Sequence, residues 1–228
     1  MAARGRLIAL EGIDGSGKST QARALSEALG ARLTFEPGAT PLGSRLRELL
    51  LAPDGAAPSP RAEALMMAAD RAEHVAQVIG PALAAGEWVV SDRYVASTVA
   101  YQGAGRGLDP TELDRVVAWA TGGLAADLSV LVDVPVEVAA ARLAAAGRHG
   151  GADRMERLGP EFAARVRAGY LNQAAADPDR WLVVDGAAEV GRIAAHIVVA
   201  VREKLGDAPG NATGDAPGAA GGRPEASR

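Results

Sequence analysis

The stretch from Gly12 to Thr20 reads Gly-Ile-Asp-Gly-Ser-Gly-Lys-Ser-Thr, and it decides the fold. It matches G-x-x-x-x-G-K-[ST], the pattern of the phosphate-binding loop, or P-loop. Residues 6–10 before it form a short apolar run, and residues 21–29 after it have helical spacing. A strand, a loop and a helix in this order form the context that the motif requires. The sequence therefore predicts a binding site for a nucleoside triphosphate.

The residue types of this loop suit phosphate binding. Its glycines allow tight turns that point backbone N–H groups at phosphate oxygens, and the following helix presents its positive end to the same anion. We expect Lys18 to reach the β- and γ-phosphates and Ser19 to hold Mg²⁺ through its hydroxyl group. The predicted nucleotide-binding residues are Gly12, Ile13, Asp14, Gly15, Ser16, Gly17, Lys18, Ser19 and Thr20.

Composition excludes several classes of protein. A net charge of −4 and a pI near 5.5 argue against nucleic-acid binding through counterion release. The absence of cysteine excludes disulfides and thiolate metal sites. The N-terminal apolar run, residues 7–10, is too short for a signal peptide or a membrane span. We expect a cytoplasmic enzyme that binds neither membrane nor nucleic acid.

Apolar runs alternate with helical patterns along the chain, which predicts an α/β fold with a parallel sheet of about five strands wrapped by helices. The expected strands are 6–10, 32–35, 87–91, 128–134 and 181–184. Residues 1–205 are predicted to form one domain. Residues 206–228 contain only Gly, Ala, Pro and polar or charged side chains, so we expect a disordered tail without buried residues.

The longest predicted helix covers residues 61–79, and Gly80-Pro81 should break or kink it. A second face of this helix carries Met67, Arg71 and His74, and His74 is expected to make a structural hydrogen bond rather than act as a base. A Gly-rich turn is expected at 103–107. The core-facing apolar stripe is expected to comprise Ala62, Leu65, Met66, Ala69, Ala76 and Ile79, and Trp88, Trp119 and Trp181 are expected to be packing residues.

Two polar groups follow the third predicted strand. Asp92 lies where a P-loop protein places the acid that holds Mg²⁺ or its waters, and Arg93 can clamp a phosphate. An exposed ion pair is the alternative. Thr98 and Gln102 are four residues apart with Tyr101 beside them, so one helical face gathers hydrogen-bonding groups and a ring. A solvated helix with a core tyrosine is the alternative here.

Several segments occur in order along the chain: Glu11-Gly-Ile-Asp-Gly-Ser-Gly-Lys-Ser-Thr20, Glu36-Pro-Gly-Ala-Thr-Pro-Leu-Gly43, Ala69-Asp-Arg-Ala-Glu-His74, Asp92-Arg-Tyr94 through Ser97-Thr-Val-Ala-Tyr-Gln-Gly103, and Asp153-Arg154 followed by Arg165-Val-Arg167. With these segments, the chain from about residue 6 to residue 204 resembles bacterial thymidylate kinase. Many families share the P-loop, but this combination is specific.

The resemblance implies transfer of a phosphoryl group from ATP to dTMP, with Mg²⁺, on a P-loop kinase fold that carries a short lid at about residues 147–157. It also implies a homodimer. By position, the implied substrate-binding residues are Asp14, Glu36, Arg47, Met67, Arg71, Arg93, Thr98, Tyr101 and Gln102; the implied metal-binding residues are Ser19 and Asp92; and the implied catalytic residues are Lys18, Arg93, Arg148 and Arg154.

Each implied contact has a place along dTMP. Arg71 and Met67 flank the thymine, and Thr98 and Gln102 hydrogen-bond its edge. Tyr101 lies against the sugar where a 2′-hydroxyl would project. In the same way, Asp14 is near the 3′-hydroxyl and Arg47 and Arg93 are near the monophosphate. In the subtype whose P-loop lacks arginine, the lid supplies the catalytic arginine, which fits the arginine-free P-loop and basic lid of this chain.

Three positions depart from the usual pattern of the family. Met67 stands where phenylalanine is usual, so a thioether contact replaces ring stacking on thymine. Phe35 replaces an arginine, and Ala39 stands where glycine is frequent.

Two other readings stay open at this point. A kinase for another nucleoside monophosphate would use the same machinery. A GTP-binding switch would commonly carry an Asn-Lys-x-Asp segment, and neither Asn172 nor Asn211 begins one.

Overall fold

The computed structural model describes residues 4–52, 57–146 and 153–208. Its centre is a five-stranded parallel sheet in the order β2-β3-β1-β4-β5. The strands are β1 (Leu7–Glu11), β2 (Arg32–Phe35), β3 (Val89–Asp92), β4 (Leu128–Asp133) and β5 (Trp181–Asp185). The predicted fold class is confirmed, with strand limits shifted by one or two residues at some ends.

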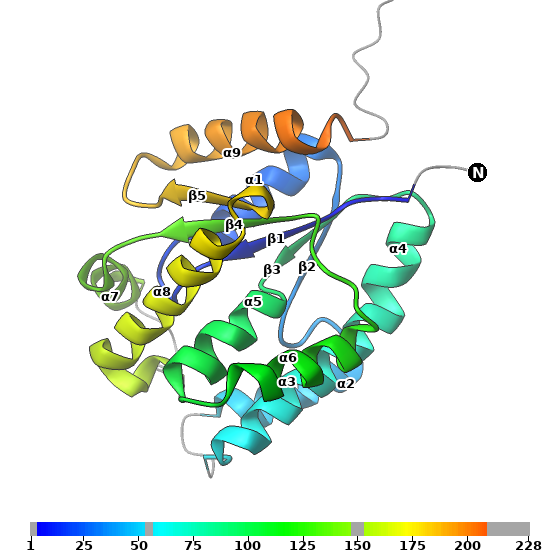
Figure 1. Cartoon of the computed structure of the whole chain (residues 1–228). Helices are drawn as coiled ribbons and strands as arrows, with labels where there is room; N and C mark the ends of the chain where they lie inside the picture. The colour runs from blue at the N-terminus through cyan, green and yellow to red at the C-terminus, as the bar shows by residue number, and fades with distance from the viewer. Residues whose placement is uncertain (1–3, 53–56, 147–152, 209–228) are drawn as a thin grey trace, which may run out of the picture.

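Helices cover both faces of this sheet (Figure 1). They are α1 (Lys18–Leu29), α2 (Pro41–Leu51), α3 (Pro60–His74), α4 (Gly80–Ala84), α5 (Val95–Thr98), α6 (Pro110–Thr121), α7 (Val136–Ala145), α8 (Gly159–Ala176) and α9 (Val190–Leu205), with π-helices η1 (Val75–Ile79) and η2 (Val99–Gly105) and 3-10 turns η3 (Glu156–Leu158) and η4 (Pro178–Arg180). Helices α1 and α9 pack on one face, and η1, α4, η2 and α8 pack on the other. No helix of the described residues combines the length and apolarity needed to cross a membrane.

Strand β1 lies at the centre of the sheet, and all five of its residues are buried. Leu10 is in register with Asp92 of β3, and Glu11 is in register with Leu131 of β4. Because parallel strands end at the same edge, the P-loop after β1 and the Asp92-Arg93 pair after β3 leave the sheet together. This edge is where the motifs of the sequence meet.

The helix does not break at Gly80-Pro81, where we expected a break or a kink. It continues as α3, η1 and α4, and the Gly80 N–H donates to the Val75 carbonyl five residues earlier. The wider π-helical turn lets the chain pass the residue that cannot donate a hydrogen bond, so Gly80-Pro81 sits inside a continuous helical run. The Gly-rich stretch 103–107 differs in the same way: η2 extends through Gly105, and only Arg106 and Gly107 form a turn.

The predicted core-facing stripe of the helix at 61–79 is correct for Ile79, which is fully buried, but wrong for Leu65, Ala69 and Ala76. Leu65 is 58% exposed and Ala69 is exposed as well, whereas Glu63, Asp70 and Arg71 are buried. The inward side of α3 therefore mixes these polar side chains with the buried Ala64 and Ala68, and Arg71 lines the cavity described below. Trp119 is another exception: it is 87% exposed on α6, although it was expected to pack.

The C-terminal boundary also differs from the expectation. Ala208 is 4% exposed and joins the cluster that contains Leu29, Trp88 and Val201. The packed chain therefore runs three residues beyond the predicted domain end, while residues 209–228 of the predicted tail lie outside the described residues.

Candidate active site

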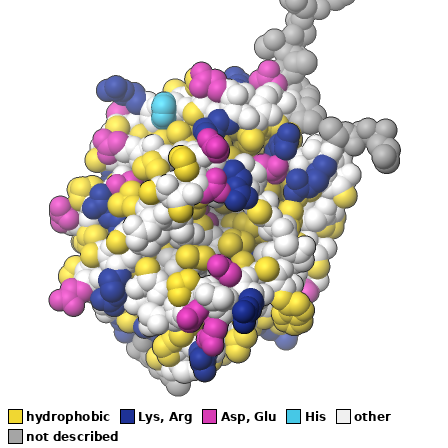
Figure 2. Space-filling model, viewed as in Figure 1, with side chains coloured by type: hydrophobic (Ala, Val, Ile, Leu, Met, Phe, Trp, Pro, Cys, Tyr) yellow, Lys and Arg dark blue, Asp and Glu magenta, His cyan; other side chains and the backbone are white. Residues whose placement is uncertain are grey.

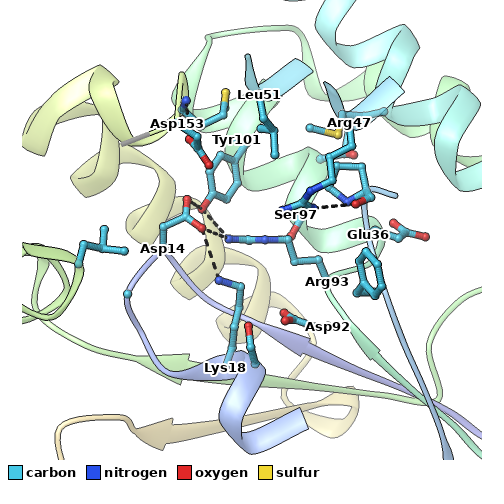
Figure 3. Close-up of a pocket in the computed structure, with 18 of the residues that line it drawn as sticks. Asp14, Lys18, Glu36, Arg47, Leu51, Asp92, Arg93, Ser97, Tyr101 and Asp153 are labelled. Atoms are coloured by element: carbon cyan, nitrogen blue, oxygen red, sulfur yellow. Dashed lines mark hydrogen bonds and ion pairs between the residues drawn. The ribbon is translucent and has the colours of Figure 1, made fainter. Parts of the chain in front are cut away.

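One cavity of about 610 Å³ opens beyond the carboxyl edge of the sheet (Figure 3). P-loop residues line one part, and groups from β3, α3, α5 and η2 line another. The residues expected to bind substrate all line it: Asp14, Glu36, Arg47, Met67, Arg71, Arg93, Thr98, Tyr101 and Gln102. The structure thus brings into one space side chains that are up to 88 residues apart in sequence, from Asp14 to Gln102.

The P-loop has the backbone that its sequence predicts. Gly12, Gly15 and Gly17 have φ angles of 146°, 83° and 95°, which residues with a Cβ rarely adopt. A Cβ on Gly15 would lie 2.4 Å from the Ala139 carbonyl oxygen. Gly17 at the N-cap of α1 has no side chain to cap the helix, and the Lys18 N–H makes only a long contact of 3.4 Å to Ser16 Oγ, so this helix end can receive an anion. Of the predicted nucleotide-binding residues, those that line the cavity are Asp14, Gly15, Gly17, Lys18, Ser19 and Thr20, while Gly12, Ile13 and Ser16 are buried beneath it.

Lys18 is buried beside Asp14, with Nζ 3.6 Å from Asp14 Oδ1 and 3.4 Å from the Ile13 carbonyl oxygen. Burial, together with the charge of Arg93, lowers the pKa of Lys18 from its ordinary value. Although burial opposes ionisation of Asp14, the charges of Arg93 and Lys18 hold its pKa well below the usual range. Asp14 is therefore an anion that separates two cations at the floor of the cavity.

Arg93 reaches across the P-loop in this structure (Figure 3). Its Nη2 donates to Asp14 Oδ1 at 2.6 Å and to the Tyr101 hydroxyl at 3.0 Å. Its Nη1 donates to the Gly12 carbonyl at 3.1 Å and to the Ser97 hydroxyl at 3.2 Å. The guanidinium therefore contacts two P-loop residues, Gly12 and Asp14, and it can exchange such partners for phosphate oxygens.

Asp92 fits the expected role of a magnesium ligand. Its Oδ1 is buried and has no hydrogen-bond partner among the described residues, and Asp92 and Ser19 line the same cavity. An unpartnered carboxylate oxygen is costly unless a ligand satisfies it. The described residues contain no group of three or more His, Cys, Asp or Glu side chains arranged for a metal.

A buried polar cluster forms the opposite part of the cavity. The Arg71 guanidinium donates to Glu36 Oε2 at 2.7 Å, to Thr98 Oγ1 at 2.8 Å and to the Tyr94 carbonyl at 3.0 Å. His74 Nδ1 lies 2.9 Å from Glu36 Oε1, and its Nε2 lies 2.6 Å from a threonine hydroxyl of β2. Glu36 therefore fixes Arg71, and the structural role expected of His74 is confirmed.

Gln102 lines the same part of the cavity, and its amide nitrogen donates to Glu63 Oε1 at 2.9 Å. Nothing in the sequence reading pointed to Glu63, which lies on α3 with its side chain fully buried.

The two lid arginines have different outcomes. Arg148 lies outside the described residues. Arg154 is 9% exposed and does not line the cavity; its Nε donates to the Leu50 carbonyl at 2.7 Å and its Nη2 to Glu63 Oε2 at 2.8 Å. A direct role of either arginine at the phosphoryl group stays a prediction.

Sequence reasoning missed two further residues, one that contacts Ser97 of the cavity lining and one that lines the cavity itself. Glu11, at the end of β1, is fully buried and accepts from the Tyr94 N–H at 2.9 Å and the Ser97 hydroxyl at 2.7 Å. Burial raises the pKa of Glu11. Arg142 of α7 lines the cavity and donates to the Ser16 and Gly186 carbonyls at 3.1 and 2.9 Å. Glu11 directly precedes the P-loop, which was the available signal, whereas Arg142 is one polar residue of an ordinary helix.

Comparison with known proteins gives one consistent result. Residues 10–197 match a family model described as Thymidylate kinase. The thymidylate kinase of Leifsonia xyli subsp. xyli is 51% identical over 198 residues, which cover 85% of this chain and 92% of the relative. That of Cutibacterium acnes is 49% identical over 187 residues, covering 79% of this chain and 88% of the relative. The crystal structure of thymidylate kinase from Ehrlichia chaffeensis superposes with a TM-score of 0.70 at 30% identity, covering 87% of this chain and 99% of that chain.

Proposed function

The chain belongs to the thymidylate kinase family, and from this premise we propose that the cavity of about 610 Å³ holds dTMP and ATP together. The enzyme is a nucleotide kinase that transfers the γ-phosphoryl group of ATP to dTMP, giving dTDP and ADP. One observation supports the placement of both substrates: the N-terminal residues of α1 line the same cavity as Arg71, Thr98 and Gln102.

Positioning and charge neutralisation are sufficient chemistry for this reaction. The phosphate of dTMP arrives as an anion, so the attacking oxygen needs no general base. We assign Lys18 to the β- and γ-phosphates and Arg93 to the transferred group, because both reach the floor of the cavity. Ser19 and Asp92 would hold Mg²⁺, which supplies charge neutralisation at the phosphate oxygens when it is bound.

The acceptor contacts follow from the lining of the cavity. Arg47 is assigned to the monophosphate and Tyr101 to the deoxyribose, with Asp14 near the 3′-hydroxyl. Met67 lies against the base in place of a ring, and its polarizable sulfur offers a contact to an aromatic face.

The proposal is tested by ADP release with ATP, Mg²⁺ and a panel of nucleoside monophosphates. We expect dTMP to have the highest kcat/KM, with dUMP weaker by at most about 1–3 kcal/mol for the missing methyl contact. A panel led by AMP, GMP or CMP would instead identify a kinase for another nucleotide. GTP binding without any phosphoryl acceptor would indicate a switch protein.

For the lid, we propose that Arg148 supplies the arginine that stabilises the transition state, in keeping with the arginine-free P-loop. Such an arginine is worth on the order of 10³–10⁵ in kcat. Arg148→Ala should therefore lower kcat with little change in the KM for dTMP, and lysine should restore it only in part. Arg154→Ala is the variant to compare with Arg148→Ala, because the Arg154 side chain donates to Glu63 in this structure rather than lining the cavity. If Arg148→Ala keeps kcat within a few-fold, the lid does not provide the charge.

We also propose that the enzyme is a cytoplasmic homodimer. Three neighbouring helices carry large exposed apolar side chains: Leu49 of α2, Leu65 of α3 and Trp119 of α6 are 63%, 58% and 87% exposed. Exposed apolar residues that gather on adjacent elements are typical of association surfaces. Leu65 and Val116 also line a shallow groove of about 350 Å³ between α3 and α6.

A further inference from the structure

Glu63 is a charged side chain that the proposed reaction does not use, although it is fully buried on α3. Its carboxylate accepts four hydrogen bonds. Oε1 accepts from Gln102 Nε2 at 2.9 Å and from Arg106 Nε at 3.2 Å. Oε2 accepts from Arg106 Nη2 and from Arg154 Nη2, both at 2.8 Å. Since a carboxylate offers about four acceptor positions, Glu63 has none left over.

Glu63 can act only as an acceptor as long as it is ionised. Burial alone raises the pKa of Glu63, but the hydrogen bonds from Arg106, Gln102 and Arg154 outweigh burial and hold the pKa below its ordinary value. The group is therefore an anion at neutral pH, and every group that contacts it must present a donor.

This requirement fixes the direction of the Gln102 amide. Its NH₂ group must face Glu63, so its carbonyl oxygen is the polar atom left for the cavity that Gln102 lines. No hydrogen bond to that oxygen is found among the described residues. Thr98 nearby accepts from Arg71 at its Oγ1, which leaves the hydroxyl proton of Thr98 free for donation.

An acceptor next to a donor matches one kind of pyrimidine edge. Thymine and uracil present N3–H, a donor, beside the O4 acceptor. Cytosine presents the reverse, with N3 as an acceptor beside an N4 amino group. A Gln102 amide turned by 180° would present its NH₂ group to the base and would suit cytosine.

We propose that Glu63 is a positioning residue that sets base specificity, by holding Gln102 with its carbonyl oxygen toward the N3–H of thymine or uracil. The inference rests on the proposed function, in which Gln102 contacts the edge of the base. Arg106 and Arg154 contribute to this role of Glu63, because they keep its carboxylate ion-paired and occupy its other acceptor positions.

The test measures binding of dUMP and dCMP by isothermal titration calorimetry, with displacement of a tighter ligand where affinity is low. These two ligands share the sugar, the phosphate and the unmethylated C5, so the ratio of their dissociation constants reports the polar edge alone. In Glu63→Gln, residue 63 no longer requires a donor from the Gln102 amide. We therefore expect the preference for dUMP over dCMP to fall by about ten-fold or more. The double variant Glu63→Gln/Gln102→Glu restores an acceptor toward the cavity and should return the ratio to within roughly three-fold of wild type.

The ratio of dTMP to dUMP affinity is the internal control, because the methyl contact does not depend on the amide direction. It should stay constant in all variants, whereas general damage to the pocket would change it. If Glu63→Gln is too unstable to titrate, Glu63→Asp keeps the charge beside the arginines, and its shorter side chain should withdraw the acceptor from Gln102 with the same loss of preference.

An unchanged dUMP-to-dCMP ratio in the Glu63 variants would overturn the inference, and so would a swap variant that fails to restore it. A failure of the proposed function is distinguishable from this result. In that case the wild-type enzyme itself would not favour dTMP in the acceptor panel, whatever the Glu63 variants do.

Discussion

Arg93 has a φ angle of 75°, and it is the one residue other than glycine with a positive φ among those that the structure describes. A residue with a long side chain costs free energy in this conformation, on the order of 1–3 kcal/mol. The cost is offset locally because the guanidinium has several hydrogen-bond partners, including Asp14 and Ser97. The unusual backbone turns the side chain back over the P-loop, which is where a phosphate would lie.

At Tyr101, two substitutions can separate the effect of the ring's bulk from the effect of its hydroxyl group. Its hydroxyl donates to Asp14 Oδ2 at 2.8 Å, and its ring lines the cavity. We predict that Tyr101→Ala narrows the preference for deoxy over ribo TMP, because the ring no longer excludes a 2′-hydroxyl. Tyr101→Phe should keep that preference while lowering kcat, since only the contacts to Asp14 and Arg93 are lost. The measurement is the ratio of kcat/KM for the two acceptors, and an unchanged ratio in Tyr101→Ala would remove Tyr101 from the sugar site.

Asp70 should make stability depend on pH in a direction unusual for a carboxyl group. Burial, and next the negative charge of Glu36, raise the pKa of Asp70 from 3.8 to about 6. Between these two values the folded state holds the proton more tightly than the unfolded state, so the free energy of unfolding falls as pH rises through this window. Asp70→Asn mimics the protonated form and keeps an acceptor for the Gly38 N–H, which now lies 2.9 Å from Asp70 Oδ1.

We therefore expect Asp70→Asn to raise stability at pH 7.5 by about 1 kcal/mol, roughly 2–4 °C in Tm, and to flatten the decline between about pH 4 and 6. Asp114→Asn is the control, because it removes the same charge from an exposed position on α6. The measurement is the Tm of wild type and of both variants by thermal melts across this pH range. A Tm of Asp70→Asn below that of the control at pH 7.5 would contradict the argument.

At the scale of elements, the π-helix η2 carries Tyr101 and Gln102 and packs on α8. Close approach depends on Gly105: a Cβ there would lie 2.7 Å from Phe162 Cε2 and 3.1 Å from Val166 Cγ2. We predict that Gly105→Ala destabilises the protein by about 1–3 kcal/mol through overpacking and raises the KM for dTMP, because η2 must move.

Gly103→Ala is the matched control in the same π-helix. The nearest atom to its added methyl would be Leu113 Cδ1 at 3.4 Å, an ordinary contact. Alanine is also the better helix former, so Gly103→Ala should be neutral or slightly stabilising. Equal losses of Tm in the two variants would show that helix geometry, rather than the contact with α8, governs this segment.

The strands and the P-loop could be predicted because their signals are local. Each strand is a short apolar run bounded by turn residues, and the loop is fixed by glycines whose φ angles the structure confirms. The π-helices could not be predicted in this way. A shift of hydrogen bonding from four to five residues leaves no mark in composition, and at 61–84 only Gly80-Pro81 hinted that the helix would be irregular.

The buried face of α3 shows a second limit. Periodicity favoured the side with Leu65, yet the inward side carries Glu63, Asp70 and Arg71. Polar residues can be buried there because partners arrive from distant segments, such as Arg106 for Glu63 and Glu36 for Arg71. The tertiary fold decides which residues pair when they are tens of positions apart. A single sequence therefore shows the polar residues but does not show which of them contact each other.

At the scale of the whole molecule, we predict a homodimer through α2, α3 and α6. Leu65→Glu and Trp119→Glu should each convert it to a monomer, because a charge on either side chain would have to be buried at the contact. Val199→Glu is the control, since Val199 is 54% exposed on α9, which covers the other face of the sheet (Figure 1). Light scattering coupled to size exclusion gives the mass. A wild-type protein of monomer mass would contradict this assembly.

On the face drawn in Figure 2, acidic and basic side chains are interspersed, and apolar side chains lie between them. Because charges of both signs are mixed, this face offers no broad field of one sign for long-range attraction of a charged partner.

The last prediction concerns where the folded unit ends. Ala208 is buried against the cluster that contains Trp88, and Asp207 Oδ1 lies 3.4 Å from Arg202 Nε. We expect a chain ended after Ala208 to match the full chain in Tm and kcat, because residues 209–228 contain little apolar surface to bury. A chain ended after Leu205 should lose about 1 kcal/mol, since a buried methyl group and its packing on Trp88 are removed. Tryptophan fluorescence, to which Trp119 and Trp181 contribute equally in both chains, distinguishes the two through Trp88, with a shift to longer wavelength expected only for the shorter chain. A drop in Tm on removing 209–228 alone would show that this segment also docks, and the predicted tail would then belong to the folded domain.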